Sequence, residues 1–109
     1  MRRIMFVLQP KPTFQAQVTI PTTEGEGKIT FEFKHKGRKQ LLELLNSIGD
    51  GEDRKTDAEA LSELITDWHG VDEKFSKENL EFLIDNYPAA AKVIFDTYNK
   101  ALFEGRQKN

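Results

Sequence analysis

The sequence contains no cysteine, and this absence removes several classes of function at once. Without thiols there are no disulfides, no thiolate metal sites and no cysteine nucleophile. Histidine is scarce, because only His35 and His69 are present, and neither lies in the HxxxH or HExxH spacing of a zinc site. No apolar run approaches membrane-spanning length, and residues 1–8 are too short for a signal peptide. We therefore expect a cytoplasmic protein that is not an enzyme and does not enter membranes.

Two further patterns have the residue types of a ligand site without the required spacing. Asp50, Glu52 and Asp53 gather in a glycine-containing stretch, but no bidentate glutamate follows at the offset of an EF-hand calcium loop. Gly25 and Gly27 precede a predicted strand instead of a helix, so they do not predict a phosphate-binding loop. We therefore predict no catalytic residue, no cofactor and no bound metal.

Charge is unevenly distributed along this chain of 109 residues, whose net charge is −2. Residues 1–55 contain 10 Lys and Arg against 7 Asp and Glu, a balance of +3. Residues 56–109 contain 6 against 11, a balance of −5. Such a division favours head-to-tail contact between copies or a partner with a basic face. The alternative is that each half simply has a charged surface in contact with water, which would give the same distribution of charge.

The first third of the chain predicts an antiparallel β-hairpin. Residues 14–20 and 28–34 alternate apolar and polar side chains, which is the pattern of half-buried strands. Residues 22–27 contain two glycines and predict the turn between them. Residues 4–8 are apolar enough for a third strand, so we place the strand region at residues 1–36.

From about residue 38 the apolar spacing becomes helical, and residues 37–109 predict four helices. The first helix ends at Gly49. Its apolar face comprises Leu41, Leu44, Leu45 and Ile48. With the hairpin in front, this order predicts one α+β domain over residues 1–109.

The second predicted helix begins with a capping box, in which Thr56 and Glu59 each accept from the other's backbone amide. Its apolar stripe comprises Ala58, Leu61, Ile65 and Trp68. This stripe predicts a helix over residues 56–69 that ends at Gly70. His69 would then lie at the helix C-terminus, where a protonated imidazole interacts favourably with the helix dipole.

Ser76 is placed to cap the third helix, and Pro88 is placed to begin the fourth. The two buried stripes comprise Leu80, Leu83, Ile84 and Tyr87, then Ala91, Ile94, Phe95, Tyr98, Ala101 and Leu102. Phe82, Val93 and Phe103 project away from these stripes. Exposing a phenylalanine forgoes roughly 1.5–3 kcal/mol of burial. We therefore predict that these three residues contact either another layer of the domain or another chain.

Residues 34–39 form the one basic run, with cations at Lys34, Lys36, Arg38 and Lys39. The run suits nucleic-acid phosphates or a basic patch for an acidic protein partner. We favour the protein partner, because the sequence pI is about 5.7 and the neighbouring Phe31 and Phe33 lie on the inward face of the predicted strand.

Several short motifs follow one another in the last third of the chain. They are Trp68-His69-Gly70-Val71, Phe75-Ser76, Leu80, Tyr87-Pro88, Tyr98 and Ala101-Leu102. This series resembles the tail assembly chaperones of long-tailed bacteriophages and prophages. By position, the residues that we expect to form the core are Trp68, Val71, Phe75, Tyr87 and Tyr98.

The resemblance implies a non-enzymatic protein that binds the tape measure protein while tail tube subunits polymerise around it. It implies the tape measure protein, the tail tube protein and further copies of the chain as partners, action in the host cytoplasm, and absence from the mature virion. Gln107-Lys108-Asn109 permits the slippery codon run at which such chaperones are extended by a frameshift. The alternatives are a bacterial protein-interaction adaptor and a nucleic-acid-binding module that uses residues 34–39.

Overall fold

The structure, a computed structural model, describes residues 6–49 and 54–104. It begins with a hairpin of β1 (Thr13–Thr22) and β2 (Gly25–Lys34), which pair antiparallel along their whole length. At the turn, the Thr22 hydroxyl donates to the carbonyl oxygen of Gly25 at 2.7 Å and accepts from the amide of Glu24 at 3.1 Å. The predicted hairpin is therefore confirmed, and its strands reach closer to the turn than alternation alone indicates.

The sheet gains its third strand from β3 (Ile65–His69), which pairs antiparallel with β2, so the strand order is β1-β2-β3. Two expectations are therefore wrong. The helix predicted over residues 56–69 ends at Ser62, and the last part of that segment is the strand. The third strand is not residues 4–8: residues 6–8 lie outside every strand with exposed side chains, and residues 4 and 5 lie outside the described residues.

A β-bulge explains why β3 has helical spacing in the sequence. The pairing register shifts between Glu32 and Phe33, so Thr66 is an extra residue on β3. Because of this extra residue, Ile65 and Trp68 lie on the same inward face although they are three positions apart, and both are buried. A spacing of three is the usual sign of a helix, so periodicity alone assigns this segment wrongly.

The described residues form four helices besides the sheet, namely α1 (Arg38–Ser47), α2 (Asp57–Ser62), α3 (Lys77–Asn86) and α4 (Ala90–Glu104). The predicted caps are confirmed: Thr56 accepts from the amide of Glu59 at 3.2 Å, and Ser76 accepts from the amide of Asn79 at 3.0 Å. His69 lies at the end of β3, so the expected interaction with a helix C-terminus is wrong. The α+β class is confirmed, with β3 inside the region 37–109 that apolar spacing assigns wholly to helices.

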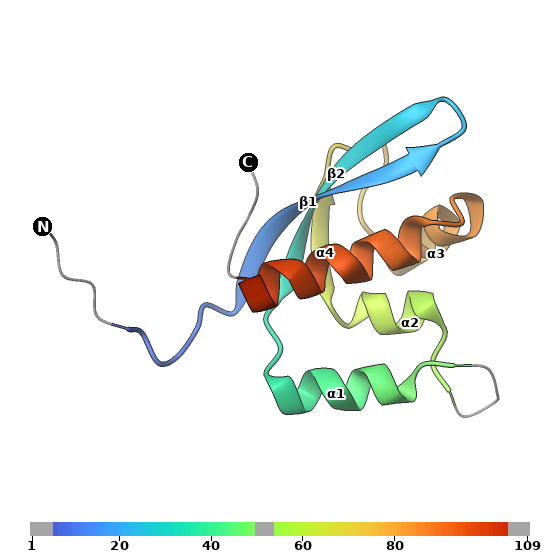
Figure 1. Cartoon of the computed structure of the whole chain (residues 1–109). Coiled ribbons are helices and arrows are strands. Elements are labelled where there is room, and N and C mark those ends of the chain that lie inside the picture. Colours follow the sequence, from blue (N-terminus) through green and yellow to red (C-terminus); the bar gives the residue numbers. More distant parts are fainter. Residues whose placement is uncertain (1–5, 50–53, 105–109) are drawn as a thin grey trace, which may run out of the picture.

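On one face of the sheet, α4 runs across β1 and α2 lies next to β3; α3 packs beside α2 and α4, and α1 lies on the far side of α2 from the sheet (Figure 1). The core lies between the sheet and these helices. An aromatic row crosses it from α4 to the loop after β3. Neighbouring ring centroids in this row are 5.1, 5.6, 6.0 and 5.2 Å apart along the series Tyr98, Phe33, Phe31, Trp68 and Phe75. The row joins the centre of the core to the edge of the molecule at which the candidate site lies.

Candidate functional site

The turn end of the hairpin extends past the last residue that pairs with β3. β3 pairs with residues 30–33, so residues 25–29 of β2 continue beyond it. The chain leaves β3 at Gly70, whose φ of +93° is in the left-handed region, and a Cβ here would lie 3.3 Å from the carbonyl oxygen of Lys28. Glycine therefore allows the chain to turn away from the sheet while in close contact with β2.

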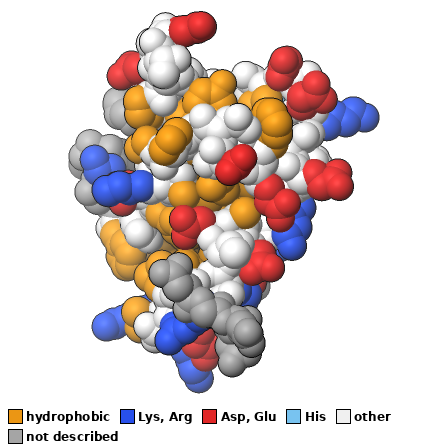
Figure 2. All heavy atoms as spheres, turned by 90° about the vertical axis from the view of Figure 1, so that its right-hand side faces the viewer, with side chains coloured by type: hydrophobic (Ala, Val, Ile, Leu, Met, Phe, Trp, Pro, Cys, Tyr) orange, Lys and Arg blue, Asp and Glu red, His pale blue; other side chains and the backbone are white. Residues whose placement is uncertain are grey.

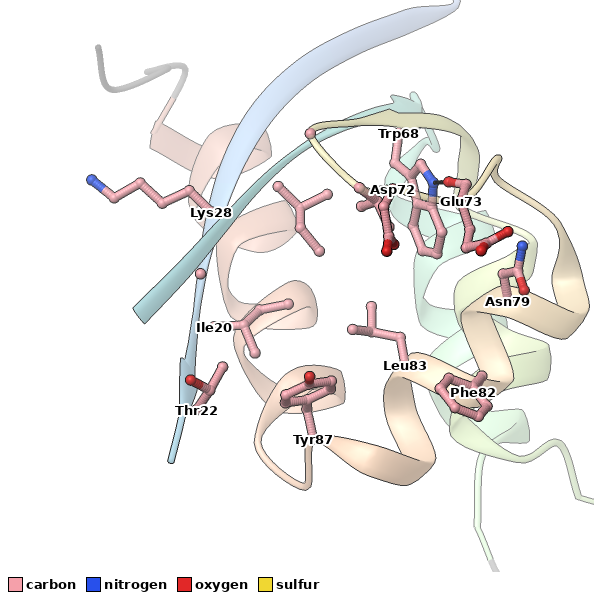
Figure 3. Close-up of a pocket in the computed structure, with 14 residues that line it drawn as sticks. Ile20, Thr22, Lys28, Trp68, Asp72, Glu73, Asn79, Phe82, Leu83 and Tyr87 are labelled. Carbon is pink, nitrogen blue, oxygen red and sulfur yellow. Dashed lines mark hydrogen bonds between the residues drawn. The ribbon is translucent and has the colours of Figure 1, made fainter. Parts of the chain in front are cut away.

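The space beside this overhang is a cleft of about 660 Å³, which we call the hairpin cleft. It is bounded by the end of the hairpin, the loop after β3 and α3, and its apolar lining includes Ile20, Ile29, Trp68, Val71, Leu83 and Tyr87. Ile20, Leu83 and Tyr87 point into the space, whereas Lys28 points away from it (Figure 3). The volume is within the range of protein sites that bind small molecules or side chains.

Trp68 forms a fixed wall of the hairpin cleft. Its indole Nε1 donates to the carbonyl oxygen of Glu73 at 2.9 Å, which ties the loop after β3 back to the strand (Figure 3). Its ring meets Phe31 and Phe75 edge to face, and only 5% of the residue is exposed. Because the indole is packed and hydrogen-bonded, the wall exists before any partner binds.

A second, shallower hollow lies between α3 and the start of α2, and we call it the acidic hollow. It is lined by Thr56, Asp57, Ala58, Glu78, Glu81, Phe82, Ile84, Asp85 and Pro88. Phe82 lines both this hollow and the hairpin cleft, and 68% of the residue is exposed. A large apolar ring therefore stands in water at the boundary between the two concave surfaces.

Carboxylates line the acidic hollow beside Phe82. The ion pairs formed by the described residues are Lys55–Glu63 and Lys92–Asp96, so none of the carboxylates that line the acidic hollow has a cationic partner among residues 6–49 and 54–104. Figure 2 looks onto this end of the molecule and shows hydrophobic side chains with Asp and Glu side chains among and beside them. The arrangement suits an apolar partner segment that also contains lysine or arginine.

A family model described as phage tail assembly chaperone matches residues 1–109, which is the whole chain. The chain belongs to the phage tail assembly chaperone family. No curated protein and no solved structure matches it. The tail assembly chaperone thus presents, at one end, an apolar cleft and an exposed phenylalanine of the kind that binds another polypeptide.

The three residues predicted to contact partners lie in different environments. Phe82 stands between the two concave surfaces, as described above. Phe103 is 69% exposed near the end of α4 and lines neither the hairpin cleft nor the acidic hollow. Val93 is half-buried and packs against the core. The structure therefore brings Phe82 alone of the three to the candidate site, and the contact role of all three stays a prediction.

Sequence reasoning missed most of the apolar lining of the hairpin cleft. Tyr87 was assigned to the core, and this assignment is wrong, because 37% of the residue is exposed and its ring faces the cleft (Figure 3). It follows the last turn of α3 as the C-cap, immediately before Pro88, so it is no longer held on the buried stripe. Trp68 and Tyr98 are buried as expected, whereas Val71 and Phe75 are half-buried against the core.

The other sequence candidates lie away from this end. The basic run follows the opposite end of the hairpin, where Lys34 pairs with Thr13, and both Phe31 and Phe33 are fully buried. No aromatic ring of these two is therefore available to stack on a base next to the run. Residues 50–53 and 105–109, with the calcium and frameshift interpretations, lie outside the described residues.

In the described part of the chain, no three His, Cys, Asp or Glu side chains are grouped so that they could hold a metal ion. Among the same residues, no helix combines the length and the hydrophobicity that crossing a bilayer requires.

Proposed function

We propose that this tail assembly chaperone holds apolar segments of the tape measure protein in the hairpin cleft and against Phe82 while tail tube subunits polymerise. Binding would take place in the host cytoplasm without a catalytic step, and the chaperone would leave before the virion is complete. One observation supports this role above the others. A large exposed aromatic ring stands beside a preformed apolar cleft, which is unusual on the surface of a protein that acts alone.

The size of the site suits a contact that must later be released. Burial of one phenylalanine gives roughly 1.5–3 kcal/mol, so each copy would bind a client segment weakly. Many copies on one long client would still retain it, because linked weak contacts combine into high avidity. Growth of the tube could then displace the copies one at a time.

Co-expression with the tape measure candidate tests this proposal. The wild-type chain should keep the client in the soluble fraction, and Phe82→Ser should lose most of this effect, because its ring no longer enters the client contact. Phe103→Ser is the matched control, since the two phenylalanines are exposed to 68% and 69% and only Phe82 borders the cleft. This control variant should keep the client soluble.

The possible results distinguish client binding at Phe82 from client binding at Phe103. Equal protection by Phe82→Ser and the wild-type chain would contradict the proposal. Loss of protection by Phe103→Ser alone would place client binding at the end of α4. Circular dichroism and thermal unfolding of both variants confirm that each is folded, which is expected because neither ring is part of the buried core.

A further inference from the structure

The N-terminal segment is the most exposed apolar stretch of the described chain. Phe6, Val7 and Leu8 are exposed to 89%, 73% and 89%. The body of the domain therefore covers little of these three consecutive side chains. In the sequence they follow Arg2 and Arg3, with two more apolar residues between. Residues 2–8 are therefore a short segment that is basic at its start and apolar along the rest.

The opposite end of the molecule has the complementary chemistry. The hairpin cleft offers an apolar lining together with the carboxylates of Asp72 and Glu73, and the acidic hollow adds four more. Among residues 6–49 and 54–104, Lys28 is the one cation that borders the hairpin cleft, and it points away from the cleft (Figure 3). Carboxylates beside an apolar cleft match a segment in which arginines precede apolar side chains.

Chain length indicates which molecule supplies the segment. Leu8 precedes Thr13 by five residues, which span at most about 18 Å. Ile20, on the cleft, lies seven residues along β1 from Thr13, or about 23 Å away. Residues 6–12 also leave the body on the side opposite the hairpin turn (Figure 1). The apolar residues of the segment therefore reach a neighbour's cleft more readily than their own.

We propose that residues 2–8 of one copy bind in the hairpin cleft and acidic hollow of a second copy. The apolar side chains would cover the cleft and Phe82, and the arginines would face the carboxylates. Each copy would give its segment to one neighbour and receive a segment from another, so the contact is heterologous and generates rings or open chains. The proposal concerns only copies of this chain, so it can be tested without any client.

Self-association of the full chain gives the first test. Sedimentation of the wild-type chain over a range of concentrations should show reversible association. In the double variant Phe6→Ser, Leu8→Ser the apparent dissociation constant should rise by about tenfold or more, which corresponds to a loss of about 1.4 kcal/mol. Leu42→Ser, which removes a half-exposed leucine from α1, should leave association unchanged.

Peptide binding gives a direct test of the site. Trp68 is the single tryptophan and lines the hairpin cleft, so its fluorescence should respond to a peptide of residues 1–10, which contains no tryptophan. The acceptor is the Phe6→Ser, Leu8→Ser chain, whose own segment does not compete. Binding should saturate for this acceptor and fail when Phe82→Ser is added to it.

Exchanging the charges of the acidic hollow and of the peptide tests whether the arginines of the bound segment face the carboxylates. Glu81→Lys with Asp85→Lys in the acceptor should abolish binding of the natural peptide, and a peptide with Arg2→Glu and Arg3→Glu should restore it. Unchanged association of the Phe6→Ser, Leu8→Ser chain would overturn the proposal. So would a wild-type chain that stays monomeric and cross-links its N-terminal segment only to its own cleft.

One consequence rests on the proposed function as well. If the client and the neighbour's segment share the hairpin cleft, the Phe6→Ser, Leu8→Ser chain should bind the tape measure candidate more tightly than the wild-type chain at equal concentration. Loss of self-association with unchanged client affinity would place the client at another surface and leave the contact between copies intact. The two proposals can therefore fail separately.

Discussion

Among single residues, Tyr98 packs α4 against the sheet through both its ring and its hydroxyl. The residue is fully buried, and its hydroxyl donates to the carbonyl oxygen of Lys34 at 2.8 Å. Its ring packs against Phe14 and Phe33, with centroid distances of 5.5 and 5.1 Å. The one side chain therefore joins α4 to the end of the hairpin by both a polar and an apolar contact.

Replacement of this residue by phenylalanine should keep the ring contacts and remove the hydrogen bond. Tyr98→Phe should lower the free energy of unfolding by about 1 kcal/mol and lower Tm by about 4–8 °C. Thermal unfolding followed by circular dichroism measures the change. Tyr87→Phe is the control, because its ring is partly exposed and should leave Tm unchanged. Equal Tm values for all three chains would show that the hydroxyl contributes nothing to stability.

The same hydroxyl predicts how stability depends on alkaline pH. Burial raises the pKa of Tyr98 from 10.0 to about 12, with the Lys36 backbone acting in the opposite direction. The folded state thus holds the proton more tightly than the unfolded state. The resulting stability is fully present below pH 10 and is lost as pH rises towards 12. The free energy of unfolding, measured in urea between pH 10 and pH 12, should fall more for the wild-type chain than for Tyr98→Phe. An equal fall for the two chains would contradict this prediction.

At the scale of elements, local signals in the sequence predicted helix starts well. Thr56 and Ser76 cap their helices through contacts within three residues, so the sequence contains the whole interaction. The identity of β3 depends instead on a partner strand more than thirty positions away and on the bulge at Thr66. The spacing of apolar residues along the sequence shows neither the partner strand nor the bulge, so it predicts a helix at Ile65 and Trp68.

Gly70 follows β3 in a backbone conformation that other residues rarely adopt, so its substitution should destabilise the fold. Gly70→Ala would place a Cβ 3.3 Å from the Lys28 carbonyl oxygen at a φ of +93°, and we expect a loss of about 1–2 kcal/mol. Gly27→Ala is the matched control, because its Cβ would have no atom closer than 4.0 Å and its φ lies outside the left-handed region. Chemical denaturation should show the loss in the first variant and none in the second. Equal stability of the two would mean that the loop after β3 shifts without cost.

At the scale of the molecule, the candidate site could not be predicted as a whole from the sequence. The hairpin cleft combines residues 20–29, 68–73 and 79–87, which only the fold brings together. Phe82 can be singled out from the sequence, because a phenylalanine off the apolar stripe of a predicted helix is visible there, and its contact role stays a prediction. For the acidic hollow, the sequence offers only the net negative charge of residues 56–109. That net charge does not indicate which carboxylates lie together in the fold.

The division of charge should make contact between copies depend on salt. Attraction between exposed charges is screened as the Debye length falls from about 10 Å at 0.1 M to about 3 Å at 1 M ionic strength. Sedimentation across this range should therefore show the dissociation constant of self-association rising several-fold. With Glu81→Lys and Asp85→Lys, association should be weak at low salt and change little as salt is added. If added salt instead strengthens association of the wild-type chain, apolar contacts alone hold the copies together, and the separation of basic and acidic halves has no part in assembly.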